Sequence, residues 1–397
     1  MKSSDIKRVV FFGTYDAWRP RLRLLQAGLA EILPAAKIIE CHFPLWNGVE
    51  DKSQLKIFGI LIRLCAMVVI HPVLIIRYLF LPRHEIVVIP YMGLFDVVAL
   101  SLFARLRGVQ LVWDIALSIY DTVVYDRKLM KASSPAAKVL YGLEWLATRL
   151  AHRIFLDTAT HARYFEELYN LKPGSVGSVF VGAENIFLND SLARPSIDRS
   201  TGRTNDRPFE ILFYGQCIPL HGIETIVRAA ELTERERKPF HWTIIGTGQE
   251  AAFIDALIKK LDLNSIGRIP SVPYHDLPSR LNRADICLGI FGTTAKATRV
   301  IPNKVFQILM AGKPLITADT PAIRELINRP CATTRLIPPG DAPALAHAVV
   351  QWYTMYPASA SDDCARLCIG AKEVGSQLLE FFNLITESVA CNTGCIQ

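Results

Sequence analysis

The sequence predicts an α/β protein built from two doubly wound, Rossmann-like domains. Short apolar runs bounded by turn residues alternate with helical patterns twice along the 397 residues, which is typical of parallel sheets with helical crossovers. A polar, basic stretch at 190–208 separates the two series and is typical of a linker. A chain of this length is also too long for one core. We therefore expect an N-terminal domain over 1–189, a C-terminal domain over 209–370, and a C-terminal helix and tail over 371–397.

The individual elements follow from the same patterns. In the first half, short apolar runs bounded by breakers predict strands at 8–13, 37–43, 85–90, 109–114, 153–158 and 178–183. In the second half, the same kind of run predicts strands at 210–215, 241–246, near 271–272, at 285–291 and at 315–317. Helical patterns lie between most of these runs, so the carboxyl ends of parallel strands are expected to carry the ligand sites.

The composition excludes several classes of protein. Apolar residues make up 51% and charged residues 20% of the chain, as in a globular protein with more apolar surface than usual. The net charge of +7 is scattered, so we expect no nucleic-acid partner. Nine cysteines without zinc-site spacing favour reduced thiols in a cytosol and no metal site. The N-terminus has no apolar core of a signal peptide, so a cytoplasmic protein is expected.

Residues 55–82 form a long apolar segment, interrupted before it reaches the roughly 20 apolar residues that span a bilayer. Lys56, Arg63 and Arg77 recur at multiples of seven and would share one helix face, subject to the kink that Pro72 imposes. A basic stripe opposite a broad apolar face is typical of a helix in the membrane interface. The alternative is a core-packing helical hairpin whose arginines reach solvent. We favour the interface, and so expect peripheral contact with the inner face of a membrane.

Residues 299–317 carry the most informative motif. Asn303 and Lys304 follow Pro302 and open an amphipathic helix that ends at Gly312, before a strand-like run. A cation and unpaired backbone N–H groups at a helix N-terminus favour an anion. The motif therefore predicts a phosphate-bearing ligand. The alternative is an ordinary turn–helix–turn–strand unit of an α/β domain, which would have the same sequence pattern.

Three glycine-containing loops follow predicted strands. Gly13 follows the first strand; Gly215 follows the first strand of the second half and precedes Gln216 and His221; Gly246 opens the sequence GTGQEA. Glycine lets backbone approach a ligand closely, and plain turns are the alternative. The third loop matches the dinucleotide fingerprint, but no acidic residue follows at the ribose-binding offset, so we do not expect hydride chemistry.

Asp114 and Asp157 stand at predicted strand ends of the first half, and His161 lies one helical turn after Asp157. Polar groups at such ends often face the ligand, but each could instead cap a helix or bond a loop. The chain shows no Walker motif, HExxH motif or Ser-His-Asp order, so P-loop and hydrolase functions are not expected.

Taken together, these residues resemble the family 4 glycosyltransferases of the GT-B fold. The resemblance rests on GTYD after the first strand, YGQCIPLHGIETIVRAA, IIGTGQEAAF and FGTTAKATRVIPNKVFQILMAGKPLIT. It implies two doubly wound Rossmann-like domains facing across a cleft, with a nucleotide-sugar donor on the second and an acceptor on the first. It also implies transfer with retention of anomeric configuration and without an obligatory metal or other cofactor.

The chain departs from the family pattern in the donor site. Gln307 stands where the second glutamate of the family motif binds the donor ribose, and we expect it to bind a ribose hydroxyl there without charge. Arg299 stands near the first glutamate. The family's diphosphate-binding arginine and lysine fall at Gln216 and His221. A neutral histidine stabilises a departing diphosphate less than lysine does, so Lys304 and Lys296 are expected to compensate.

For the first-domain catalytic position, which commonly holds His or Asp in this family, the resemblance implies Asp114 first and His161 second. It predicts a membrane-associated enzyme that moves a sugar from a nucleoside diphosphate sugar to a lipid-linked or polysaccharide acceptor. The missing donor-site charges keep a non-catalytic scaffold of polysaccharide biosynthesis open, and a nucleotide-sugar epimerase of the same fold is a further alternative.

Overall fold

The structure is a computed structural model, and its two compact units are described separately. It describes residues 6–46, 57–188, 208–329, 331, 333–355 and 368–393. Unit 1 comprises Met1–Phe180 and Ala371–Gln397, and unit 2 comprises Val181–Gly370. The boundary thus falls after Phe180 rather than at 189, and the C-terminal helix belongs to the first unit. Apart from Pro208, the predicted linker lies outside the described residues.

The sheet of unit 1 has six parallel strands in the order β2-β1-β3-β4-β5-β6. They are β1 Arg8–Gly13, β2 Lys37–His42, β3 Ile86–Ile89, β4 Gln110–Ala116, β5 Arg153–Leu156 and β6 Val176–Ser178. The last strand ends where we expected it to begin, because the chain leaves the sheet there. The Phe180 N–H donates to the side chain of Gln377, 2.9 Å away, instead of continuing the ladder.

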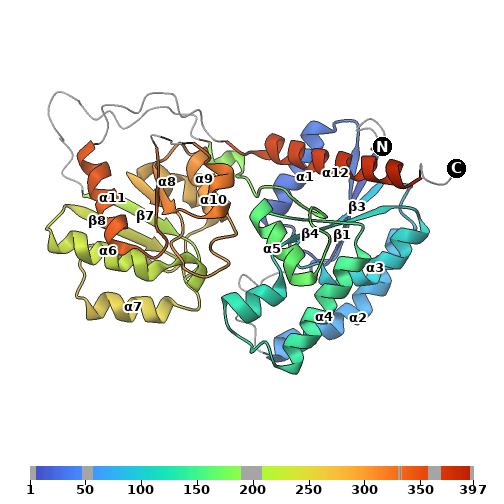
Figure 1. Cartoon of the computed structure of the whole chain (residues 1–397), viewed down its shortest axis with the longest axis horizontal. Helices are drawn as coiled ribbons and strands as arrows, with labels where there is room; N and C mark the ends of the chain where they lie inside the picture. The colour runs from blue at the N-terminus through green and yellow to red at the C-terminus, as the bar shows by residue number, and fades with distance from the viewer. Residues whose placement is uncertain are drawn as a thin grey trace. The chain divides into compact units, whose positions relative to one another are not determined.

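Helices cover both faces of this sheet (Figure 1). They are α1 Pro20–Ile32, α2 Ile57–Leu79, α3 Leu94–Leu106, α4 Pro135–Leu150, α5 Ala159–Tyr169 and α12 Ala371–Thr393, with a π-helix, η3, at Asp121–Asp126. Helices α2, α3 and α4 pack in series, whereas α12 packs along α1. Glycines permit that second contact, since a Cβ on Gly28 would lie 2.7 Å from the Gly375 nitrogen.

Helix α2 is one continuous helix through Pro72, not the hairpin of the alternative prediction. Its inner face is buried at Met67, Leu74 and Tyr78, while its outer face is apolar and exposed. By length and composition alone, the window Leu61–Leu79 could cross a membrane, and only 17% of it is buried. It is the one such helix in the part of the chain that the structure describes.

The arginines of α2 point back to the protein. The Arg63 guanidinium lies 5.8 Å from the ring centroid of Trp46 and also bonds the Gly59 carbonyl of its own helix at 3.1 Å. Arg77 donates to the His42 carbonyl at the end of β2, 3.5 Å away. Lys56, the third member of the predicted basic stripe, lies outside the described residues.

The sheet of unit 2 also has six parallel strands, in the order β12-β11-β10-β7-β8-β9. They are β7 Phe209–Tyr214, β8 Phe240–Ile245, β9 Ile266–Ile269, β10 Ile286–Leu288, β11 Leu315–Ala318 and β12 Thr334–Ile337. The strand predicted near 271–272 is absent; β9 pairs with β8 a few residues earlier, where Gly267 and Arg268 interrupt the apolar pattern. The last strand, β12, was not predicted.

The helices of unit 2 complete the alternation of strand and helix. They are α6 Ile223–Arg235, α7 Ala251–Lys260, α8 Leu277–Arg283, α9 Asn303–Met310, α10 Pro321–Leu326 and α11 Ala342–Met355, with 3-10 turns η4 Asn185–Phe187, η5 Pro219–His221 and η6 Tyr274–Asp276. One core of strand and helix residues, including the fully buried Trp242, joins α6 and α11 to the sheet.

Candidate functional site

Two glycine loops interlock at the carboxyl ends of β7 and β8. Gly215 and Gly246 have φ angles of +142° and +144°, which favour glycine. A Cβ on Gly246 would lie 1.9 Å from the Gly215 carbonyl oxygen, and one on Gly215 would lie 2.7 Å from Lys304 Nζ. The structure therefore brings together three residues that the sequence predicted for the donor site.

Lys304 is the most unusual side chain of this site. It is 5% exposed, and its Nζ lies 3.8 Å from the ring centroid of Phe213. The amine has no hydrogen-bond partner among the described residues. Burial holds the pKa of Lys304 well below its ordinary range. A buried amine without a hydrogen-bond partner is a place where an anion can bind, because the anion supplies both the missing partner and a counter-charge for the protonated form.

The predicted neighbours of Lys304 lie on the same edge of the sheet. His221 is buried, and its Nδ1 hydrogen-bonds the Gln216 carbonyl, which leaves Nε2 as the acceptor in the neutral ring. Asn303 opens α9, whose first turn has neither a side-chain cap nor an acidic residue. Lys296 is buried in the turn that precedes this helix.

The prediction that Gln307 binds the donor ribose is not supported by its surroundings. The side chain is 4% exposed and both ends of its amide are already bonded. Tyr214 donates to its Oε1 at 2.9 Å, and its Nε2 donates to Tyr274 Oη at 3.3 Å. Tyr274 in turn donates to Glu184 at 2.5 Å. Gln307 is therefore a buried member of a series of polar contacts that leads to the half-buried Tyr274 and Glu184. The two tyrosines and Glu184 are the partners that the sequence analysis missed.

In unit 1, the Gly13 loop is occupied by a carboxylate of the protein. Asp96 of α3 accepts hydrogen bonds from the Thr14 N–H at 3.0 Å and from its hydroxyl at 3.2 Å. His71 of α2 hydrogen-bonds the same carboxylate. The sequence analysis missed this contact, although a histidine within an apolar helix is a signal for a buried polar partner.

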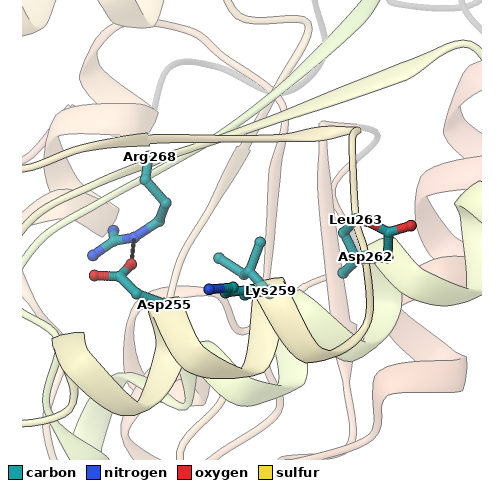
Figure 2. Close-up of a pocket in the computed structure, with 6 residues that line it drawn as sticks. Asp255, Lys259, Asp262, Leu263 and Arg268 are labelled. Atoms are coloured by element: carbon teal, nitrogen blue, oxygen red, sulfur yellow. Dashed lines mark hydrogen bonds and ion pairs between the residues drawn. The ribbon is translucent and has the colours of Figure 1, made fainter.

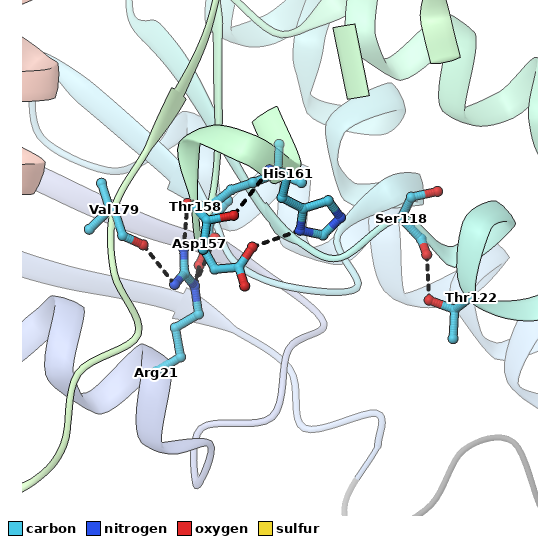
Figure 3. A network of polar contacts seen from close by, with 9 residues as sticks. Arg21, Ser118, Thr122, Asp157, Thr158, His161 and Val179 are labelled. Atoms are coloured by element: carbon cyan, nitrogen blue, oxygen red, sulfur yellow. Dashed lines mark hydrogen bonds and ion pairs between the residues drawn. The ribbon is translucent and has the colours of Figure 1, made fainter. Parts of the chain in front are cut away.

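Asp114 has a structural role rather than the catalytic one expected first. It is 1% exposed and receives three hydrogen bonds of 2.8–3.0 Å from the Arg21 guanidinium. Arg21 also donates to the Val179 carbonyl at 3.1 Å (Figure 3). The carboxylate joins α1 to the sheet, and the Arg21 guanidinium balances its charge.

His161, the second catalytic candidate, keeps an unpaired nitrogen. Its Nδ1 lies 2.6 Å from Asp157 Oδ1, and Thr158 caps the helix that carries it (Figure 3). In the neutral ring, the Asp157 carboxylate favours the proton on Nδ1, which leaves Nε2 as the acceptor. Nε2 is buried and has no hydrogen-bond partner in the described part of the chain. Buried polar atoms are rarely unpaired, so a ligand hydroxyl or a water molecule is its expected partner.

A buried glutamate, Glu144, holds the segment at residues 118–120, next to the Asp157–His161 pair. Glu144 of α4 accepts from the Ser118 hydroxyl and the Ile119 N–H, both at 2.6 Å, and from the Tyr169 hydroxyl. Burial raises the pKa of Glu144 above its ordinary value, although these donors oppose the shift. The π-helix η3 follows directly, and short π-helices are frequent near functional sites.

A small hollow of about 220 Å³ lies elsewhere on unit 2, between α7 and β9 (Figure 2). Within it, Arg268 Nε lies 2.8 Å from Asp255 Oδ1. None of the predicted site residues lines it, and its two central charges are paired with each other. Among the described residues there is no group of three or more His, Cys, Asp or Glu side chains that could hold a metal ion.

Comparison with known proteins identifies the class to which unit 2 is similar. Residues 208–355 match the family model of the group 1 glycosyl transferases. Over 142 residues the chain is 28% identical to the amylovoran biosynthesis glycosyltransferase AmsK of Erwinia amylovora. This match covers 35% of each chain.

Solved structures match over nearly the whole chain. Sucrose-phosphate synthase from Thermosynechococcus elongatus has a TM-score of 0.62 at 14% identity, covering 98% of this chain and 97% of its own. HepE from Anabaena, in complex with UDP and glucose, has a TM-score of 0.57 at 14% identity, covering 98% and 100%. These matches confirm the GT-B type of two-domain fold, whereas the family model and the match to AmsK confirm the resemblance to glycosyltransferases.

Proposed function

We propose that the protein is a glycosyltransferase that moves a sugar from a nucleoside diphosphate sugar to a lipid-linked or polysaccharide acceptor. The family match of unit 2 supports the reaction class. The observation that carries the proposal is the buried, unpaired Lys304 amine beside the Gly215 loop. The similarity to AmsK supports an acceptor from polysaccharide biosynthesis.

In this proposal, unit 2 stabilises the leaving diphosphate. Lys304 Nζ and the uncapped N-terminus of α9 lie at one edge of the sheet, and both favour negative charge. Charge that develops on the diphosphate as the glycosidic bond breaks meets donors that are already in place. The resemblance to family 4 enzymes implies retention at the anomeric carbon without an obligatory metal, and we include both in the proposal.

Unit 1 would contribute His161. With Nδ1 held by Asp157, the free Nε2 can accept a hydrogen bond from a sugar hydroxyl. This role does not extend to Asp114, whose carboxylate is paired with Arg21.

We further propose that unit 1 binds the cytoplasmic face of a membrane through a docking surface. This surface consists of the exposed apolar side chains on α2, α3 and α4, which are Leu61, Ile62, Val68, Val69, Val73, Ile76, Leu79, Leu102, Leu106, Val139, Trp145 and Leu146. The three helices pack in series on one side of the sheet. Arg149 lies against Trp145, 4.3 Å from its ring centroid, and exposed Lys138 is on the same helix. Apolar side chains with cations beside them suit an anionic lipid surface.

The proposed donor site can be tested by thermal shift with UDP, GDP, dTDP, CMP and ADP. UDP is the first to try because HepE was solved with it. One nucleotide should stabilise the wild type and lose most of its effect in Lys304→Ala. Lys313→Ala is the matched control. Lys313 follows the C-terminal end of α9 and donates to the Asn282 and Ala284 carbonyls, so its loss should leave the response intact.

The same panel separates the proposal from the scaffold alternative. A protein that responds to none of the nucleotides would be better explained as a non-catalytic scaffold. Conversion of a nucleotide sugar into its epimer without an acceptor would instead indicate the epimerase.

A further inference from the structure

Both ring nitrogens of His71 face hydrogen-bond acceptors. Nδ1 lies 2.9 Å from the Met67 carbonyl oxygen, and Nε2 lies 2.9 Å from Asp96 Oδ1. Neither a carbonyl oxygen nor a carboxylate can donate. Two good hydrogen bonds therefore require a proton on each nitrogen, which makes His71 an imidazolium with Asp96 as its counter-ion.

The same carboxylate holds the loop after β1. Its Oδ2 accepts from the Thr14 N–H at 3.0 Å. Gly13 has a φ of +135°, and a Cβ there would lie 2.5 Å from Asp96 Oδ2. Glycine at this position is therefore what admits the carboxylate. A continuous series of polar contacts runs from the middle of α2, through α3, to the carboxyl end of β1.

The charged groups around His71 favour this state. Burial lowers the pKa of His71, but the hydrogen bond and charge of Asp96, with the Met67 carbonyl, raise it overall above its ordinary value. On β2, which also packs on α2, the titratable group that contacts this helix is Cys41, whose thiol lies 3.7 Å from the Leu74 carbonyl. Burial raises the pKa of Cys41, so that group stays neutral.

We propose that His71 is a positioning residue, which through Asp96 holds the Gly13–Thr14 loop and connects the docking surface on α2 with the carboxyl edge of the sheet. The connection to the membrane rests on the proposed function, whereas the protonation state and the hold on the loop do not. If α2 becomes more ordered when it docks, the loop should become more ordered with it. Loss of the His71 proton should release the loop.

The test uses two buried histidines of the full-length protein. His84 is the matched control, because its ring nitrogens contact the Tyr78 hydroxyl and the Pro82 carbonyl. In the part of the chain that the structure describes, it bonds no loop at the carboxyl end of the sheet. Burial lowers the pKa of His84 below its ordinary value. In ¹⁵N spectra at pH 7, His71 should show two protonated nitrogens and His84 one. A neutral His71 ring would overturn the proposal without any variant being made.

Hydrogen exchange then measures the hold on the loop. His71→Gln keeps one donor but removes the charge, and we expect Thr14 N–H to exchange at least about tenfold faster, the equivalent of about 1.4 kcal/mol. His84→Gln should leave Thr14 unchanged. Equal Thr14 exchange in both variants and the wild type would refute the role of His71.

Vesicles of phosphatidylglycerol and phosphatidylcholine test the connection to the docking surface. They should slow Thr14 exchange further in the wild type and in His84→Gln, but not in His71→Gln. Binding without any change at Thr14 would overturn the connection. Failure of the nucleotide panel would overturn the proposed function and leave these readouts standing.

Discussion

Replacing Lys304 with methionine should stabilise the ligand-free protein while removing its response to a nucleoside diphosphate. The Lys304 amine is buried, has no hydrogen-bond partner among the described residues and faces the Phe213 ring. An unsatisfied buried polar group costs about 1–3 kcal/mol. Methionine has a similar length and no polar hydrogen, so Lys304→Met should recover about that amount. In a unit the size of unit 2 this corresponds to a rise in Tm of about 2–12 °C.

The pH dependence of stability gives a second measure of the same group. Because the pKa of Lys304 is depressed in the folded protein, the unfolded chain binds one more proton between that pKa and the ordinary value near 10.4. The free energy of unfolding should therefore rise with pH in this window and level off above it. Lys304→Met should lack this slope, so the advantage of the variant should shrink from pH 7 towards pH 10.

Calorimetry completes the test of Lys304. A diphosphate beside Nζ should raise its pKa, so binding should take up as much as about one proton near pH 7. Titrations in two buffers of different ionisation enthalpy measure this uptake directly. Saturating nucleotide at a hundred times its Kd should stabilise the wild type by about 2.7 kcal/mol and Lys304→Met by much less. If the variant is no more stable, and binding takes up no proton, the assignment of Lys304 as a buried anion site is wrong.

Three further predictions concern the other parts of the proposal. Val68→Glu replaces a side chain of the docking surface that is 74% exposed with a charged one, and should weaken flotation with anionic vesicles at least about tenfold. Phe253→Glu, at an exposed apolar position of unit 2, should not weaken it. Equal effects of the two variants would refute the role of the docking surface in membrane binding. Gln307→Glu adds a second carboxylate to the hydrogen-bonded series that ends on Glu184, so the free energy of unfolding should fall by about 1–3 kcal/mol in denaturant titrations. An unchanged unfolding midpoint would mean that these side chains are not bonded to one another. His161→Gln should lower kcat about 10²–10⁴-fold with little change in nucleotide-induced Tm shift, and near-normal turnover would remove it from the reaction.

Most of the fold could be predicted because it depends on local patterns. Buried parallel strands such as Ile86–Ile89 are short apolar runs. Glycine marks the ends of β1, β7 and β8, at Gly13, Gly215 and Gly246. The misses occurred where the pattern is diluted: Gly267 and Arg268 occupy the middle of β9, and β12 contains Thr334 and Arg335. Membership of α12 in unit 1 could not be predicted, because its contact with α1 depends on tertiary packing.

The candidate site was only partly predictable for a related reason. Positions on one loop, such as Gly215 beside Lys304, follow from motif spacing. Whether a polar side chain is available depends on partners far along the chain. Asp114 is paired with Arg21, 93 residues away, and Gln307 bonds Tyr214, which is equally distant. No local sequence pattern indicates such long-range pairs. Asp114 and Gln307 were therefore expected to be available to a ligand, although both are bonded within the protein.

The donor site departs from its family pattern in a way that makes physical sense around Lys304. Gln216 and His221 are neutral where the resemblance implies cations, yet His221 Cε1 and Lys304 Nζ both lie close above Gly215. Two buried ammonium groups at this distance would repel each other in the ligand-free protein. At 4 Å, an ion pair is worth about 4 kcal/mol at an effective dielectric constant of 20 and about 1 kcal/mol in bulk water. One buried lysine that is protonated as the diphosphate binds therefore attracts it more strongly than one exposed cation does, so the missing charges do not by themselves argue for a non-catalytic protein.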